Sequence, residues 1–258
     1  MLFILFMGFP IISGILERIH SLIVSRVPER SNVKSIKSIF RNPLFAALSS
    51  LIIYFLPRIS YGIIVDVACG YGWLSGFLNR LGMYVLGIDI SRDAILNAKK
   101  NFPGPSYIIA SALKLPLKNS SVSTVISIET IEHLKDGESF LREIYRILKV
   151  KGVLLLSTIN GDSLYHRIYR VLTGKNCVIC RFHIHEYNQH ELIRILEDIG
   201  FSVKEKGLLS FVYPIFIPQI ALLYLLIAFL TSKNYWLFNV KDKSLMGIFL
   251  LFNIIKEG

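Results

Sequence analysis

Between residues 61 and 207, short apolar runs alternate with stretches in which apolar residues recur every three or four positions. Runs rich in β-branched residues are typical of buried strands, and the longer spacing is typical of helices that pack on them. The pattern predicts strands at 63–68, 84–89, 107–110, 122–128, 153–159, 201–206 and 245–255. It predicts helices at 73–81, 91–100, 138–148 and 188–199. This alternation indicates an α/β fold with a mostly parallel sheet of seven strands.

Three stretches of the chain carry no charged residue, at 1–16, 42–57 and 207–232. Because a membrane-spanning helix needs roughly 20 apolar residues, only the third is long enough. Pro214 and Pro218 interrupt its first half. A single crossing would also separate the last strand from the rest of the sheet. We therefore expect a re-entrant or interfacial segment, with a full span and a buried helix as the open alternatives.

The chain accordingly divides into two predicted parts. Residues 1–60 form an apolar and basic helical region that associates with a membrane. Residues 61–258 form the α/β domain, with an apolar insertion at 208–244 before the last strand.

The charge of the chain changes this picture in one respect. Lysine and arginine number 29 against 18 acidic residues, a net charge of +11, and 53% of residues are hydrophobic, which excludes a disordered chain. Six basic residues follow the first apolar stretch: Arg18, Arg26, Arg30, Lys34, Lys37 and Arg41. Such a segment suits the anionic cytoplasmic face of a membrane, while a solvated helix face is the alternative. No nucleic-acid-binding motif accompanies the charge, so we expect no nucleic acid partner.

A glycine-rich turn follows the first predicted strand, in the segment Asp66–Gly72. Gly70 and Gly72 allow a tight turn and a close approach of the backbone to a ligand. Asp89 ends the second strand, where its carboxylate can accept hydrogen bonds from both hydroxyls of a ribose. The combination indicates a nucleoside-containing ligand.

Two such ligands compete. A dinucleotide fingerprint requires a third glycine at position 75, which is Ser75 here, and Gly76 comes one residue late. The fingerprint also gives no reason for Asp66 in the turn. S-adenosylmethionine carries an amine that this carboxylate can pair with, a ribose and no phosphate. The residues favour S-adenosylmethionine, and an NAD(P)-dependent oxidoreductase remains the weaker alternative.

At this point the sequence resembles class I S-adenosylmethionine-dependent methyltransferases, in particular the small-molecule type-11 group. The resemblance covers residues 61–207 and rests on motifs that occur in the family's order, at 66–72, 85–91, 111–117, 127–134, 148–154 and 183–192. It implies a Rossmann-like class I methyltransferase fold and S-adenosylmethionine as the cofactor. It also implies a set of cofactor-binding residues: Asp66, Ala68, Gly70, Gly72, Asp89, Ile90, Ser111, Ala112, Leu113 and Glu129.

Within this set, the resemblance places Asp66 to Gly72 along the methionine moiety, Asp89 on the ribose and Ile90 against one face of the adenine. Ala112 and Leu113 would lie beside the adenine ring. Ser111 departs from the family pattern, which has an acid there, and a hydroxyl accepts the adenine amino group without charge assistance.

Methyl transfer from a sulfonium depends mainly on positioning, but a hydroxyl acceptor would also need a general base. We expect His133 and Glu132 to take this catalytic role, with His183 and His185 as further candidates. Cys177, Cys180, His183 and His185 have zinc-ligand spacing. The resemblance already accounts for a histidine near 183, so we expect no metal.

Together these patterns predict a methyltransferase that acts on a small, lipophilic or lipid-linked acceptor at the membrane surface. We expect it at the cytoplasmic face, with peripheral or re-entrant attachment. The alternative outside enzymes is an inactive, membrane-anchored module of the same fold.

Overall fold

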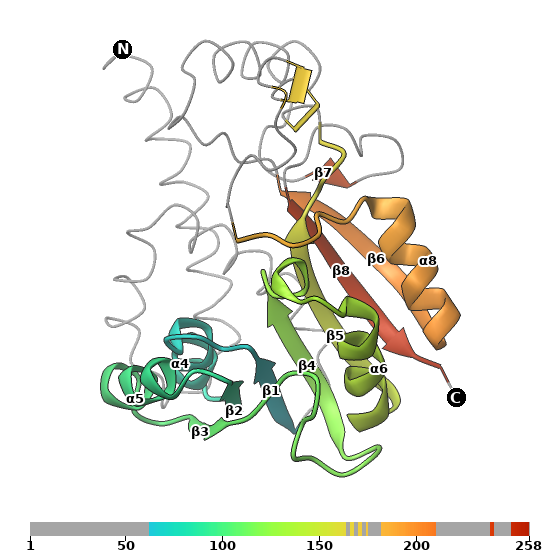
Figure 1. The fold of residues 1–258 in the computed structure, drawn as a ribbon. Coiled ribbons are helices and arrows are strands. Elements are labelled where there is room, and N and C mark those ends of the chain that lie inside the picture. Colours follow the sequence, from blue (N-terminus) through green and yellow to red (C-terminus); the bar gives the residue numbers. More distant parts are fainter. Residues whose placement is uncertain are drawn as a thin grey trace.

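The computed structural model describes residues 62–163, 166–167, 170–171, 174, 182–209, 238–239 and 249–257. Within these residues the chain forms one sheet of eight strands in the order β3-β2-β1-β4-β5-β8-β6-β7 (Figure 1). The strands are β1 (Ile63–Val67), β2 (Tyr84–Asp89), β3 (Ser106–Ile109), β4 (Val122–Ile128), β5 (Leu148–Ile159), β6 (Phe201–Leu209), β7 (Phe238–Asn239) and β8 (Phe249–Lys256). The helices are α4 (Trp73–Arg80), α5 (Arg92–Asn101), the 3₁₀ turn η3 (Ile131–His133), α6 (Gly137–Ile147) and α8 (Gln189–Ile199).

The direction of the strands confirms the predicted mostly parallel, Rossmann-like sheet. β1 to β5 pair in parallel, whereas β8 runs antiparallel to both β5 and β6. The chain order reverses between β1 and β4, and ligands of open α/β sheets bind at such a switch point, beyond the carboxyl ends of the strands. The two-residue β7 is an eighth strand at the edge that the sequence did not predict.

The starts of β5 and β8 differ most from the prediction. β5 begins at Leu148 and not at residue 153, because Leu148 already pairs with Val122 before the register shifts and Val153 pairs with Thr124. The intervening residues include Lys151 at φ 61°, which gives the bulge its kink. β8 begins at Phe249 and not at residue 245.

The core fills both sides of the central strands. Phe140 and Ile144 of α6 pack with Leu192 and Leu196 of α8 in one buried cluster, and Figure 1 shows these two helices on the same side of the sheet. A smaller cluster holds α5 against the turn and β3: Cys69, Ile95, Ala98 and Tyr107. The smaller cluster includes Cys69 of the turn after β1, so this turn rests on packed side chains.

Polar caps and a glycine define the ends of two helices. Ser91 caps α5 by accepting a hydrogen bond from the Ala94 N–H at 3.2 Å. Asn188 caps α8 in a reciprocal capping box with Glu191, and Gly200 ends that helix in the left-handed conformation.

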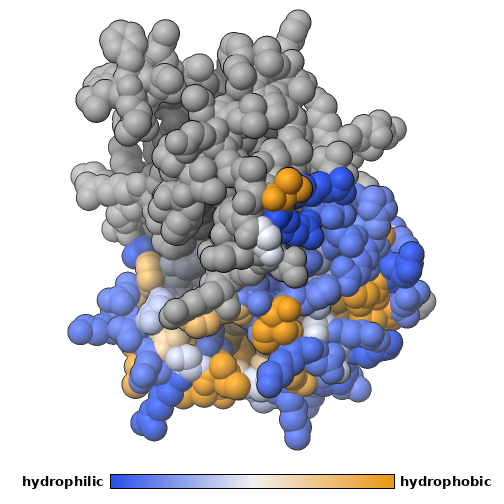
Figure 2. Space-filling model, turned by 45° about the horizontal axis from the view of Figure 1, so that its top comes forward, coloured by the Kyte–Doolittle hydropathy of each residue, from blue (hydrophilic) through white to orange (hydrophobic). Residues whose placement is uncertain are grey.

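The predicted membrane segments lie mostly outside the described residues, as does the whole of 1–60. Of the predicted insertion 208–244, the first two residues belong to β6, and residues 238–239 form β7. β7 pairs with Gly207 and Leu208. Among the described residues, the structure contains no helix long and apolar enough to cross a bilayer. On the face shown in Figure 2, hydrophobic residues of the described part are scattered among hydrophilic ones, as is usual for a domain surface.

Candidate functional site

The turn after β1 contains three residues in the left-handed backbone conformation. Ala68, Gly70 and Gly72 have φ values of 59°, 51° and 77°. The N–H of Cys69 donates to the Ile88 carbonyl at 3.0 Å, which ties the turn to β2. α4 begins directly after Gly72, and no side chain of that residue caps its first amides. The turn therefore joins the ends of β1 and β2 to the start of α4.

The two glycines of this turn are required for different reasons. A Cβ built on Gly72 would lie 2.7 Å from the Ala98 Cβ and 2.8 Å from the Tyr107 hydroxyl, so this glycine is required for packing. A Cβ built on Gly70 would meet nothing within 4 Å. The outer side of the turn at Gly70 is open, as a bound nucleoside ligand requires.

Asp89 lies at the end of β2, directly beside this turn. Its Oδ2 accepts from the Gly70 N–H and its Oδ1 accepts from the Ser91 N–H, both at 2.8 Å. Each carboxylate oxygen has two lone pairs, so each retains one for a further donor. The geometry fits the predicted contact with two ribose hydroxyls, and it fixes the carboxylate before any ligand binds.

Two of the residues predicted to contact the adenine are exposed apolar side chains. Ile90 is 72% exposed and Leu113 is 42% exposed, although both are large and hydrophobic. The Ala110 N–H donates to the Asp89 carbonyl at 3.0 Å, which holds the 111–113 loop beside the end of β2. Ser111 Oγ accepts from the Leu113 N–H at 3.2 Å, so this hydroxyl already stabilises the loop. The half-buried Ala112 lies between Ser111 and Leu113 in this loop.

Asp66 lies beneath the turn and is buried. The Ser75 hydroxyl donates to its Oδ2 at 2.5 Å, which ties β1 to α4. Burial raises the pKa of the Asp66 carboxyl from 3.8 to about 7, the hydrogen bonds from Ser75 oppose the rise, and the Asp89 charge adds to it. In this position Asp66 stabilises the turn, and its contact with the cofactor amine remains a prediction.

The raised pKa of Asp66 predicts a pH-dependent stability. The unfolded chain loses this proton near pH 4 and the folded chain near pH 7, so the folded state binds more protons in between. The free energy of unfolding should therefore fall as the pH rises from 4 to 7. Asp66→Asn retains an acceptor for Ser75 and has no proton to lose. We expect its free energy of unfolding to exceed that of the parent at pH 7.5 by up to ~4 kcal/mol.

Urea unfolding of both proteins at several pH values would measure this difference. Parallel pH profiles for parent and variant would contradict the prediction.

A second group of side chains lies where β4 and β5 end. Glu129 has a left-handed φ of 50°, and its Oε1 accepts from the Ser157 hydroxyl at 2.6 Å. Burial and the neighbouring Glu132 carboxylate raise the pKa of Glu129 well above its usual range, against the opposing bond from Ser157. Glu129 thus lies at the switch point, on the same edge of the sheet as Asp89.

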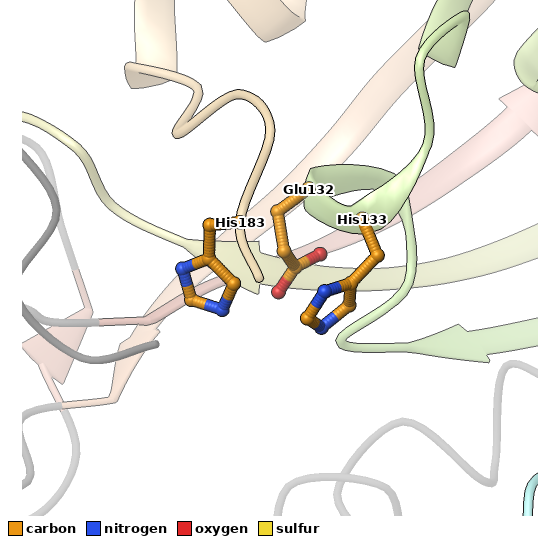
Figure 3. A group of neighbouring side chains, drawn as sticks. All are labelled: Glu132, His133 and His183. Carbon is orange, nitrogen blue, oxygen red and sulfur yellow. The ribbon is translucent and has the colours of Figure 1, made fainter. Parts of the chain in front are cut away.

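The predicted catalytic residues have different surroundings. Glu132 is fully buried, and its Oε2 accepts from the Thr158 hydroxyl at 3.0 Å. His133 is exposed, and its ring centroid lies 4.9 Å from that of His183 (Figure 3). His185 contacts Glu191 instead, with 2.7 Å between Nε2 and Oε1. Cys177 and Cys180 lie outside the described residues.

Sequence reasoning missed three supporting side chains: Ser75, Ser157 and Thr158. Ser75 was considered only as a missing glycine, although it is the partner of Asp66. Ser157 and Thr158 lie near the end of a predicted strand, and that position was the signal that could have identified them.

A shallow basin lies at the other end of the strands, near the start of β4 and β5. Its lining includes Lys114, Leu117, Glu143 and Arg146. Arg146 donates to the Leu115 and Leu117 carbonyls, and Glu143 accepts from the Leu115 N–H. These bonds fasten the loop before β4 to α6. The basin is therefore structural, and the strand ends remain the candidate site.

Comparison with known proteins agrees with this geometry. Residues 65–156 match the family model described as a methyltransferase domain, and the match includes every predicted cofactor-binding residue. This segment is a methyltransferase domain. Over 145 residues the methyltransferase domain and its flanks are 30% identical to a probable S-adenosylmethionine-dependent methyltransferase of Mycobacterium tuberculosis, covering 56% of this chain and 50% of that protein.

Other relatives extend the comparison. The ubiquinone biosynthesis O-methyltransferase of Pelagibacter ubique is 35% identical over 101 residues, which are 38% of this chain and 42% of that protein. The fold is similar to the crystal structure of a SAM-dependent methyltransferase from Archaeoglobus fulgidus, with a TM-score of 0.57 and 18% identity over 81% of this chain and 93% of that one. The chain spans about half the length or less of the curated relatives described here. The predicted family and its cofactor, S-adenosylmethionine, are confirmed for the methyltransferase domain.

Proposed function

We propose that this protein transfers a methyl group from S-adenosylmethionine to a small acceptor. The observation that carries the proposal is the Asp89 carboxylate, held by Gly70 and Ser91 with one lone pair left on each oxygen. It lies in a domain whose relatives are named as methyltransferases. Bound S-adenosylmethionine supplies a methyl group that its sulfonium already activates.

The residues of the chain then act mainly by positioning. Asp89 orients the ribose, Ile90 and Leu113 cover the adenine, and the open side of Gly70 leaves room for the methionine part. Because positioning of donor and acceptor can supply several kcal/mol of the barrier reduction, this set provides the donor side of catalysis. The exposed His133 is the candidate base for a hydroxyl acceptor.

Incubation of the full chain with methyl-labelled S-adenosylmethionine and a lipid extract tests this function. We expect labelled product with the parent protein and much less with Asp89→Ala at a limiting concentration of the donor. Tight cofactor binding without turnover would instead favour the inactive module, and preferential binding of NADH would favour the oxidoreductase.

We further propose that the acceptor is lipophilic and that the protein works at the cytoplasmic surface of a membrane. The uncharged stretch 207–232 and the net charge of +11 support this location. A relative named for ubiquinone biosynthesis supports a lipophilic acceptor. β6 and β8 are antiparallel neighbours that pair at Leu209 and Phe249. The segment between them therefore leaves and re-enters the sheet at the same end of these two strands. This return supports an interfacial or re-entrant segment over a single crossing.

The membrane proposal predicts a separable attachment. Replacing residues 210–237 with a short linker keeps β6 and β7 intact, and we expect the variant to bind vesicles more weakly than the full chain in a flotation assay, because only residues 1–60 remain to attach it. It should still bind S-adenosylmethionine. For the full chain, high salt should weaken binding to anionic vesicles but not abolish it, because only the basic part of the attraction is screened.

Equal flotation of the full chain and the linker variant would contradict the proposal. So would opposite sidedness of accessibility tags at residues 100 and 240, because the segment would then span the bilayer.

A further inference from the structure

Glu132 is an unusual residue for the interior of a domain. Its side chain is fully buried, and its Oε1 has no hydrogen-bond partner among the described residues. Burying a carboxylate oxygen without a partner is unfavourable, and native proteins rarely leave one in this state. The hydrogen bond from Thr158 satisfies only the other oxygen, Oε2. The Glu129 carboxyl also forms a side-chain hydrogen bond with Glu132, so Glu132 belongs to a buried carboxyl pair that a neighbouring cation would stabilise.

Two imidazole rings lie beside this carboxylate. Figure 3 shows the Glu132 carboxyl group between the rings of His133 and His183, which come from η3 and from the segment before α8. One potential ligand atom from each of the three residues lies within 4.8 Å of the others. Two ligand atoms on one tetrahedral zinc-like ion lie roughly 3.4 Å apart, since each bond is about 2.0 to 2.2 Å long. Side-chain movements of up to roughly 1.5 Å would thus complete the coordination.

The backbone holds the two contributing segments together. The N–H groups of Ile184 and His185 both donate to the Glu132 carbonyl, at 2.8 and 3.2 Å. These bonds join η3 to residues that lie some 50 positions later in the chain, and they fix His183 opposite the carboxylate. The cluster is consequently part of the fold and not an accident of mobile side chains.

The Nδ1 atom of each histidine ring also contacts an oxygen of the protein. His183 Nδ1 lies 3.0 Å from Glu186 Oε1, which leaves Nε2 for another partner. A carboxylate behind a histidine is the usual outer support of a metal ligand. His133 Nδ1 lies 3.3 Å from the Phe182 carbonyl, a long contact on an exposed ring, so this ring can turn easily.

We propose that Glu132, His133 and His183 bind one divalent transition-metal ion. One carboxylate and two imidazoles are donors that zinc, cobalt and similar ions prefer over magnesium or calcium. Three protein ligands leave coordination positions for water or for an oxygen of a second molecule. The site is separate from the Asp89 contact with the ribose, so metal binding does not depend on the methyl-transfer proposal. An ion on His133 would replace its role as a general base, because the same ring nitrogen cannot do both.

Cobalt titration of the full chain, stripped with a chelator and free of S-adenosylmethionine, tests the site directly. We expect one Co²⁺ per chain, detected by its d–d absorption bands in the visible range. Zn²⁺ should compete for the same site in calorimetry. Glu132→Gln, which retains the shape, and His183→Ala should each weaken binding at least tenfold. His133→Ala should also weaken it, and this exposed change cannot be attributed to misfolding.

His185→Ala is the matched control, because His185 lies two residues from His183 but contacts Glu191. It should bind cobalt as the parent does. The double variant Cys177→Ser and Cys180→Ser should also bind normally and show that no thiolate band contributes. Absence of saturable binding in the parent, unchanged affinity in Glu132→Gln and His133→Ala, or loss in the cysteine variant would each overturn the proposal.

Discussion

Asp89→Ala is expected to weaken S-adenosylmethionine binding by about 2 kcal/mol or more, roughly 30-fold in the dissociation constant. The substitution removes the charged acceptor proposed for the ribose hydroxyls. It also leaves the Gly70 and Ser91 N–H groups without their partner, so the turn itself is less well fixed. Calorimetric titration with S-adenosylmethionine and with S-adenosylhomocysteine would measure both affinities.

Asp93→Ala is the matched control for this prediction. It removes the same charge four residues away, from an exposed position in the first turn of α5. We expect its effect on cofactor affinity to be small. Equal affinities for Asp89→Ala and the parent would show that the ligand does not use this carboxylate.

The two glycines of the turn should respond differently to the same substitution. Gly72→Ala places a methyl group 2.7 Å from Ala98 and adds left-handed strain, so we expect a loss of roughly 2 to 5 kcal/mol in the free energy of unfolding. Gly70→Ala meets no protein atom within 4 Å and carries only the strain, about 1 to 2 kcal/mol. Its methyl group projects into the space assigned to the cofactor, so affinity should fall while the fold persists.

Thermal unfolding and cofactor titration on both variants separate the two effects. If Gly70→Ala binds S-adenosylmethionine as tightly as the parent, the open side of this turn does not face the ligand.

The strands and helices near the cofactor were predictable because local signals coincide there. The predicted bounds of β2, 84–89, are those observed, and the Ser91 cap places α5 correctly. β5 was placed too late because its bulge at Lys151 and Gly152 looks like a turn in the sequence. β7 could not be predicted, since two residues carry no periodicity and pair only through the tertiary fold.

The part of the site that lies within neighbouring strands and their loops was predictable from the sequence. Asp89, Gly70 and Gly72 act within a single β-turn-α-β unit, and their spacing along the chain reflects their geometry. The burial of Asp66 depends on Ser75, and the surroundings of Glu132 depend on Thr158 and on residues 183–185. The contacts of Glu132 join elements that are distant in sequence, so no local motif records them.

The position of β8 has a consequence for synthesis. β8 lies between β5 and β6, yet it follows both in the chain. On the ribosome, a nascent chain that has emerged only through residue 209 leaves β5 and β6 each with an open edge that faces the missing strand. Exposed edges of this kind invite pairing with other chains. The buried Lys256, whose Nζ donates to the Tyr145 and Leu148 carbonyls, completes the closure, so a truncation before residue 249 should aggregate even though every cofactor-binding residue is present.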